Sequence, residues 1–185
     1  MPLSGLLDGE AEGEHPGGEV VGEDLVGFCG CQRHPEIVAA RPGRHNLRVT
    51  LTPAEADQIL ADNFAPWVLA LGLTVEETGE RHAVLRLPWS DSLARDGGGL
   101  SGQALMAAAD TATVIAVSAA RGAYGPMTTV QQSTSFQRPV VGTDVLITVR
   151  VTKLGKRMAF ADATMTPDGA QDPAATASTV YALLG

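Results

Sequence analysis

The chain has 185 residues, of which 44% are hydrophobic and 18% are charged, and its formal net charge is -8 at pH 7. This length suits one domain with a proper core. The charge forms no basic stripe, which argues against a nucleic-acid partner. No apolar run approaches the length of a membrane span, and the acidic N-terminus is unlike a secretory signal, so we expect a cytoplasmic protein without a membrane span.

Residues 1–45 are rich in Gly and Glu and hold eight acidic but only three basic residues. This composition is typical of a disordered leader. Cys29, Cys31 and His34 lie close together within it, but a closed zinc site needs four ligands, usually with a Cys-x2-4-Cys spacing. We therefore expect two reduced thiols and no metal site, followed by one ordered domain over residues 46–185.

The first predicted elements of the domain are an amphipathic helix and two short strands. Thr52 suits the N-cap, Pro53 the first helical position and Glu55 the capping box. Apolar residues at helical spacing extend this helix to about Gly72. Two strand-like pieces follow between residues 73 and 88, and the second alternates as a half-buried strand does.

A central helix is predicted over residues 101–121, because these residues are rich in alanine and apolar nearly all round. Such a helix must be enclosed by other elements. Strand-like segments follow at 128–139, at 144–153, around 158–160 and at 176–184. There is no internal repeat. A long buried helix followed by four antiparallel strands, with a strand before it, predicts an α+β fold in which an antiparallel sheet wraps around the helix.

The stretch from Gly97 to residue 110, GGGLSGQALMAAAD, leaves several chemical interpretations open. It satisfies the G-x-G-x-x-G pattern of dinucleotide sites, but the expected acid about twenty residues on is missing and the following strands look antiparallel. Ser101 resembles a serine nucleophile, yet all four histidines precede it, so it is better interpreted as an N-cap. Asp110 is an isolated acid on an apolar, enclosed helix, where burying it costs desolvation energy. Such an acid is retained either because it is well hydrogen-bonded or because it takes part in catalysis. Asp162, among alanines in a strand, fits a structural acid that is paired across the sheet or faces solvent.

Several blocks of the sequence resemble the PaaI-like acyl-CoA thioesterases of the hotdog superfamily, in that family's order and spacing. They are 99–103 (GLSGQ) through Asp110, 129–131 (TVQ) leading to 136–139 (FQRP), and 154–156 (LGK) leading to Phe160, within roughly residues 64–184. The resemblance implies a hotdog fold and thioester hydrolysis without a cofactor, since coenzyme A is part of the substrate. It also implies a homodimer or homotetramer, because hotdog monomers expose a sheet edge and half of an active site.

The resemblance also assigns roles to residues of the central helix. In that family the helix opens with His-Gly-Gly and carries a catalytic Asp further along. Here Ser101 and Gln103 replace the His and the second Gly, while Gly102 and Asp110 stand at the family's positions. The implied mechanism places the thioester oxygen against the Gly102 amide, and the Gln103 amide beside it, at the helix N-terminus. Asp110 of the partner subunit would then activate water as general base, with direct attack by Asp110 as nucleophile the weaker alternative, and Thr129 would orient the water.

The phosphates of coenzyme A would meet the basic positions that the resemblance marks. These are Arg138 beside Pro139, and Lys153, Lys156 and Arg157 around the turn at Gly155. By composition alone, such a turn is more often a solvated hairpin end.

Two alternatives come from other functional classes. A hotdog dehydratase or hydratase would need a histidine working with an acid, and no histidine follows His82. A catalytically silent protein that binds acyl-CoA or lipid is the stronger alternative, because Ser101 and Gln103 both depart from the family motif. The sequence does not specify whether the acyl group is aryl or alkyl, or short or long. It also does not distinguish a dimer from a tetramer.

Overall fold

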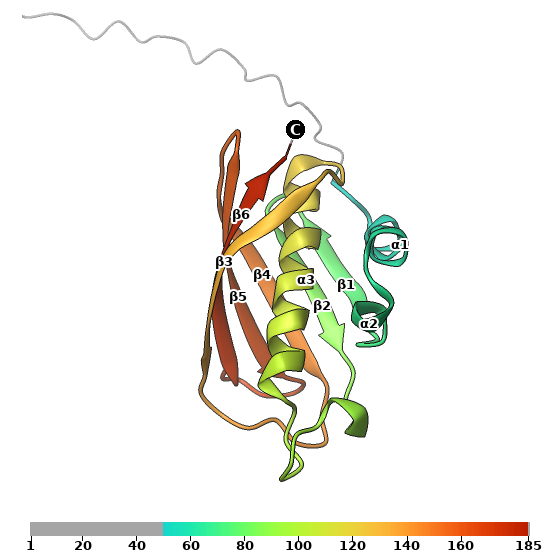
Figure 1. Ribbon diagram of the computed structural model, residues 1–185, viewed down its shortest axis with the longest axis vertical. Coiled ribbons are helices and arrows are strands. Elements are labelled where there is room, and N and C mark those ends of the chain that lie inside the picture. The colour runs from blue at the N-terminus through green and yellow to red at the C-terminus, as the bar shows by residue number, and fades with distance from the viewer. Residues whose placement is uncertain (1–49, 185) are drawn as a thin grey trace, which may run out of the picture. The chain divides into compact units, whose positions relative to one another are not determined.

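The structure is a computed structural model that describes residues 50–184. The predicted leader, with its two cysteines, and the first residues of the predicted domain lie outside the described residues. The elements, drawn in Figure 1, are α1 (Pro53–Asn63), α2 (Pro66–Leu69), β1 (Thr74–Gly79), β2 (His82–Leu87), the 3-10 turn η1 (Asp91–Leu93), α3 (Gly102–Arg121), β3 (Met127–Phe136), β4 (Val145–Leu154), β5 (Met158–Pro167) and β6 (Ala175–Leu183).

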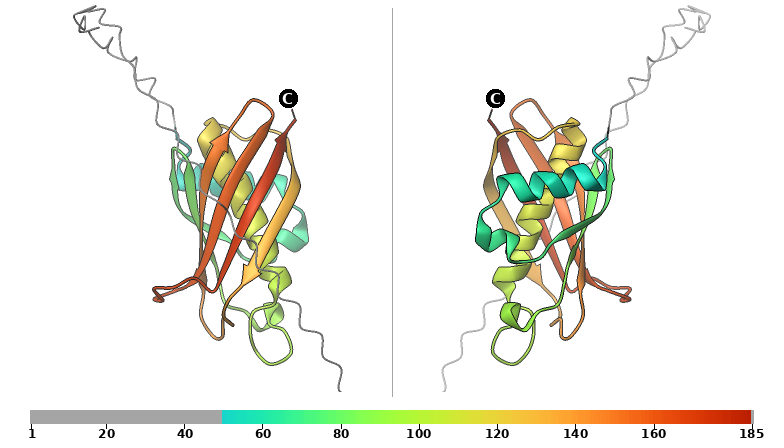
Figure 2. Two further views of the ribbon diagram at one scale, coloured as in Figure 1. Left: turned by 90° about the vertical axis from the view of Figure 1, so that its left-hand side faces the viewer. Right: turned by 90° about the vertical axis from the view of Figure 1, so that its right-hand side faces the viewer.

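The six strands form one antiparallel sheet in the order β1-β2-β4-β5-β6-β3, and Figure 2 shows this sheet curving around α3. The prediction of an antiparallel sheet wrapped around a central helix is therefore confirmed. One face of β4 enters the core through Val145, Ile147, Val149 and Val151, as its alternating pattern predicts. Asp162 lies exposed on the opposite face, where it accepts a hydrogen bond from Ser178 Oγ at 2.8 Å, so it is the structural acid expected.

The central helix begins and ends as its sequence indicates. Ser101 Oγ accepts from the N–H of Ala104 at 3.2 Å, and Gly122 ends α3 in the left-handed conformation, with φ of 76°. Every residue from 111 to 120 is buried. By length and composition α3 could cross a membrane, with a mean hydropathy of 1.3 over its best window, but 78% of that window is buried inside the domain. Its apolar character is accounted for by the sheet that encloses it.

The predicted first helix is two helices, so that prediction was wrong in its extent. The capping box of Thr52 and Glu55 is present, but α1 ends at Asn63. Pro66 disfavours the α conformation at the residue before it, and Ala65 is indeed extended, with ψ of 150°. The proline ring then suits the start of α2, which leaves Trp67 65% exposed.

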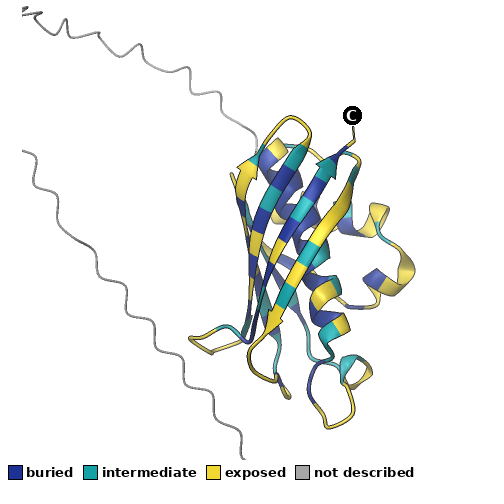
Figure 3. Ribbon diagram, turned by 60° about the vertical axis from the view of Figure 1, so that its left-hand side comes forward, coloured by how far each residue is buried: buried dark blue, intermediate teal, exposed yellow. Residues whose placement is uncertain are grey.

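The two edges of the sheet differ. At β1, Asp57 of α1 accepts a hydrogen bond from the N–H of Val75 at 2.9 Å, which occupies part of that edge. At β3, seven of the ten residues are exposed and none is buried, and no described strand lies beyond it (Figure 3). Apolar side chains gather on this open side: Met106 of α3 is 40% exposed, and Val130 and Phe136 of β3 are 57% and 51% exposed. An open edge beside apolar side chains is the usual form of an interface.

One arginine joins three carboxylates at the surface where β1, β2, β4 and β5 meet their loops. Arg86 Nη1 lies 3.1 Å from Asp144 Oδ2 and 2.7 Å from Asp168 Oδ2, and Arg86 Nε donates to Glu76. The N–H of Trp89 donates to Asp144 at 2.8 Å. That backbone hydrogen bond, followed by Arg86, lowers the pKa of Asp144.

We predict that Asp144→Asn reduces the loss of stability in acid. Because the folded-state pKa of Asp144 is lowered, this carboxylate contributes stability above its unfolded pKa of about 3.9, and the contribution is lost as the pH falls below that value. The urea midpoint should therefore fall less between about pH 6 and about pH 3 in the variant than in the unmodified protein. An equal fall in the two proteins would contradict the proposed contribution.

Candidate active site

Asp110 lies half-buried on α3, where it faces β3 and β6. Thr129 Oγ1 of β3 donates to Asp110 Oδ1 at 2.8 Å, and the Tyr181 hydroxyl of β6 donates to the same oxygen. Among the described residues, no group donates to Oδ2. The carboxylate is thus held by two hydroxyls at one oxygen, while the other oxygen can accept a hydrogen bond from a water molecule.

Tyr181 is the buried partner of this carboxylate. Its side chain is 2% exposed, and its hydroxyl also donates to the backbone oxygen of Asp110 at 2.9 Å. Burial is the main cause that raises the pKa of Tyr181 far above its ordinary value, and the negative charge of Asp110 adds to it. The phenol therefore stays protonated and keeps donating to Asp110.

The start of α3 provides bare amides. Since Ser101 caps the amide of Ala104, the N–H groups of Gly102 and Gln103 have no partner among the described residues. Phe136 packs over Gly102, because a Cβ built at residue 102 would lie 3.1 Å from the Phe136 ring. The first turn of the helix can therefore donate hydrogen bonds to an oxygen that approaches along this ring.

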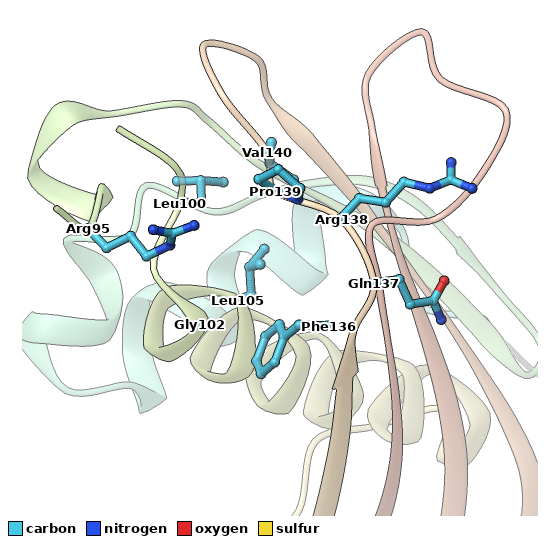
Figure 4. A pocket seen from close by; sticks show the side chains of 9 residues that line it. All are labelled: Arg95, Leu100, Gly102, Leu105, Phe136, Gln137, Arg138, Pro139 and Val140. Carbon is cyan, nitrogen blue, oxygen red and sulfur yellow. The ribbon is translucent and has the colours of Figure 1, made fainter. Parts of the chain in front are cut away.

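A pocket of about 390 Å³ opens beside this helix start, and Figure 4 shows it from close by. Its walls are largely apolar, and its charged lining residues are Arg95 and Arg138. The other lining residues are Leu100, Gly102, Leu105, Phe136, Gln137, Pro139 and Val140. Arg138 and Pro139, predicted from the resemblance to bind substrate, thus lie at the same pocket as Gly102.

The second predicted basic group lies elsewhere. Lys153, Gly155, Lys156 and Arg157 are exposed at the turn between β4 and β5. Lys153 Nζ lies 5.7 Å from the centroid of the Phe160 ring. Because Gly102 and Phe136 lie at the other end of these ten-residue strands, on the order of 30 Å away, one chain does not bring this turn to the pocket.

The helix itself separates two further predicted residues. Gly102 is the first residue of α3 and Asp110 lies more than two turns along, about 12 Å at the rise of an α-helix. One carbonyl group cannot contact the Gly102 amide and also receive water activated by the Asp110 of the same chain.

No group of three or more His, Cys, Asp or Glu side chains that could hold a metal ion occurs among the described residues.

Sequence reasoning missed two residues of this region. Tyr181 was part of a predicted strand, and its signal was a single phenol among small and apolar residues on the inward face. Arg95 was part of a predicted loop, and only its position before the triple glycine distinguished it. Neither signal was sufficient alone, since tyrosines are common in strands and arginines in loops.

Comparison with known proteins shows what this chain is similar to. The model of the thioesterase superfamily matches residues 97–174. No functionally curated protein matches the chain.

Solved structures share the fold at low sequence identity. The Escherichia coli PaaI protein from the phenylacetic acid degradation operon is 20% identical, with a TM-score of 0.63, over 72% of this chain and 94% of that one. Zebrafish thioesterase superfamily member 2 is 24% identical, with a TM-score of 0.65, over 73% of this chain and 100% of that one. A variant of PaaI from Thermus thermophilus is 24% identical, with a TM-score of 0.58, over 65% of this chain and 100% of that one. These likenesses confirm the predicted hotdog fold.

We predict that Tyr181→Phe lowers the free energy of unfolding by about 1 kcal/mol, because it removes a buried donor from two oxygens of Asp110 and leaves the ring packing unchanged. Urea unfolding followed by circular dichroism measures the difference. Tyr124→Phe serves as the matched control, since Tyr124 is 40% exposed in the loop after α3. An unchanged midpoint for Tyr181→Phe would contradict the proposed role of its hydroxyl.

Proposed function

We propose that this protein is an acyl-CoA thioesterase that hydrolyses its substrate with carboxylate-activated water, because it shares the hotdog fold and because the model of the thioesterase superfamily matches residues 97–174. One observation carries this proposal above the others. The carboxylate of Asp110 is oriented through Oδ1 by two hydroxyls, and its Oδ2 has no donor among the described residues. The oxygen without a protein donor is the one that can accept a proton from water, while the other fixes the direction of the carboxylate.

In the proposed reaction, Asp110 Oδ2 accepts a proton from water as the water oxygen attacks the thioester carbonyl carbon. Thr129 donates its own proton to Asp110, so its oxygen lone pairs remain free to accept a hydrogen bond from the same water. The tetrahedral intermediate then expels the thiolate of coenzyme A. Thiolate is a good leaving group, so the site needs no strong general acid, which suits a site without histidine.

The negative charge that develops on the carbonyl oxygen would meet the start of α3. The N–H groups of Gly102 and Gln103 are available there, and the helix dipole favours an anion at the same place. Substituting Gln for the family's second Gly leaves its backbone N–H in place. Ser101 serves this arrangement as the helix cap, so the amides of the first turn keep their direction.

The separation of Gly102 from Asp110 supports a site built from two copies of the chain. Gln132, at the middle of β3, donates to the backbone oxygen of Met106, which lies midway between Gly102 and Asp110 on α3. A two-fold axis that passes beside Gln132 and Met106 would pair the open β3 edges of two copies in antiparallel fashion. It would also set each Gly102 opposite the Asp110 of the other copy. The exposed Met106 and Val130 would be covered at the same time.

The same two-fold axis gives the second basic group a place in the reaction. Because the two copies run in opposite directions, the β4–β5 turn of one copy would lie at the same end of the dimer as the pocket of the other copy. Lys156 and Arg157 would then join Arg138, whose guanidinium is directed away from the pocket (Figure 4), in binding the phosphates of coenzyme A. A cytoplasmic location remains a prediction of the sequence.

A catalytically silent acyl-CoA-binding protein is the second candidate, favoured by Ser101 and Gln103 at the positions of the family's His and Gly. It shares the pocket and the bare amides but releases no thiol. Binding of an acyl-CoA without thiol release above background would favour this candidate over the thioesterase.

We predict that Asp110→Asn lowers kcat by about 10³-fold, because the amide cannot take a proton from water. The amide oxygen can still accept from Thr129 and Tyr181, so the urea midpoint should stay near that of the unmodified protein. Thiol release from butyryl-CoA and from phenylacetyl-CoA gives the measurement. Asp162→Asn is the matched control, since Asp162 is an exposed acid on the outer face of the sheet. Retained turnover in Asp110→Asn would eliminate Asp110 as the base.

We predict that Gly102→Pro lowers kcat by about 10²-fold or more, because proline removes the N–H of one oxyanion donor. Proline is accepted at the first position of a helix, and Ser101 is already extended, with ψ of 144°. Gly102→Ala is the control, because it brings a comparable Cβ toward Phe136 and keeps the N–H. Equal losses in the two variants would show that crowding of Phe136, and not the amide, matters.

Co-expression of Asp110→Asn with Gly102→Pro tests whether two chains share the site. A mixed dimer then has one site with both residues intact and one with both defects. About a quarter of the unmodified activity should return if the two chains pair at random. No recovery in a sample whose mixed dimers are verified by mass spectrometry would place both residues of a site in one chain.

A further inference from the structure

The pocket beside the start of α3 carries an inference about the acyl group, which rests on the proposed function. Gly102, at whose amide the thioester carbonyl would bind, is one of its lining residues. The rest of the wall is apolar apart from Gln137, Arg95 and Arg138, and none of its lining residues is acidic. A small pocket with cationic side chains and no carboxylate favours an anionic ligand group.

The two arginines of this pocket are not equivalent. Arg138 Nη1 pairs with Asp172 Oδ2 at 3.0 Å, and Figure 4 shows its guanidinium directed away from the pocket. Arg95 is directed back over the pocket toward the helix start (Figure 4). Its side chain donates to the backbone oxygen of Asp96 at 3.0 Å, and no described carboxylate forms an ion pair with it. Arg95 is therefore the cation that this pocket offers to a ligand.

The triple glycine holds Arg95 in this position. The N–H of Arg95 donates to the Gly99 oxygen at 2.8 Å, and the Arg95 oxygen accepts from the Gly98 N–H at 3.0 Å, so its backbone is fixed at both ends. Gly97 and Gly98 have φ of 88° and 77°, which side chains rarely allow. A Cβ at Gly97 or Gly99 would lie 3.5 Å or 3.6 Å from the guanidinium nitrogens. The Arg95 guanidinium thus lies along the turn of residues 97–99, where the glycines have no side chains to displace it.

Distance separates the two parts of the substrate that could supply the anion. An open pocket of about 390 Å³ is on the order of 9 Å across, so an anion bound in it lies within about that distance of a thioester carbonyl at Gly102. The pantetheine arm contains two amide units and a cysteamine, so an extended arm places the phosphates of coenzyme A on the order of 15 Å from the sulfur. A carboxylate at the end of a short acyl chain fits the nearer distance.

We propose that this pocket selects short acyl groups that end in a carboxylate, and that Arg95 binds this carboxylate. Butyryl and succinyl groups have the same number of carbon atoms and differ in this terminal group, so they separate the effect of charge from the effect of size. Arg95 is a specificity residue in this proposal, and the chemistry at Asp110 and Gly102 is the same for both substrates.

The test compares binding of two non-hydrolysable thioethers, S-(3-carboxypropyl)-CoA and S-butyl-CoA, by isothermal titration calorimetry with the full chain. The unmodified protein should bind the carboxylate analogue about tenfold more tightly. Arg95→Gln should abolish this preference and leave the affinity for S-butyl-CoA unchanged. Arg150→Gln, a change of an exposed arginine on the outer sheet face, should keep the preference.

Two outcomes would overturn the inference. Equal affinity of the unmodified protein for both analogues would show that the pocket does not distinguish the carboxylate. A similar loss of affinity for both analogues in Arg95→Gln would show that Arg95 meets the phosphates of coenzyme A.

Thiol release by the unmodified protein separates this inference from the proposed function. Hydrolysis of butyryl-CoA without a preference for the carboxylate analogue contradicts the inference alone. A preference for the carboxylate analogue without hydrolysis of butyryl-CoA or succinyl-CoA supports the inference and contradicts thioesterase activity.

Discussion

The burial of α3 is the constraint on which the rest of the structure depends. A sheet can pack closely around a helix only if the side chains on the buried face of that helix are small. Alanines along the buried face of α3 let the strands approach it. The enclosed helix can expose polar atoms in few places, which are its first turn and the side next to β3. The bare amides of Gly102 and Gln103 and the carboxylate of Asp110 occupy those places. The candidate chemistry is therefore concentrated where the packing leaves the helix open.

The hydroxyls around Asp110 explain how a carboxylate is retained on such a helix. Tyr181 and Thr129 supply hydrogen bonds from two strands that pair with each other, so the orientation of the carboxylate depends on the register of β3 and β6. The register shifts beside Thr129, at the exposed Val130. A bulge at this point rotates the strand locally and aims the Thr129 hydroxyl at α3.

Local sequence signals predicted most of the fold because they act over a few residues. The capping box at Thr52, the cap at Ser101 and the alternation in β4 all have the form that the sequence indicates. The continuous first helix was wrong because apolar spacing was weighed above Pro66. In the site, Arg95 and Tyr181 act through contacts with residues distant in the fold or across a glycine turn, and no local pattern encodes them. Lys153 and Arg138 lie at opposite ends of the sheet because of the directions in which the strands run. A short sequence motif does not indicate these directions.

The unequal edges of the sheet also limit how far strands can be added. Asp57 satisfies an amide of β1 and α1 lies beside that strand, whereas β3, paired with β6 on one side, has no strand among the described residues on its outer side. A further strand can therefore add to the sheet more readily at β3 than at β1, where this hydrogen bond and α1 occupy part of the edge. The contact that anchors α1 thus also hinders strand addition at β1, which limits how far the sheet can extend from one copy to the next.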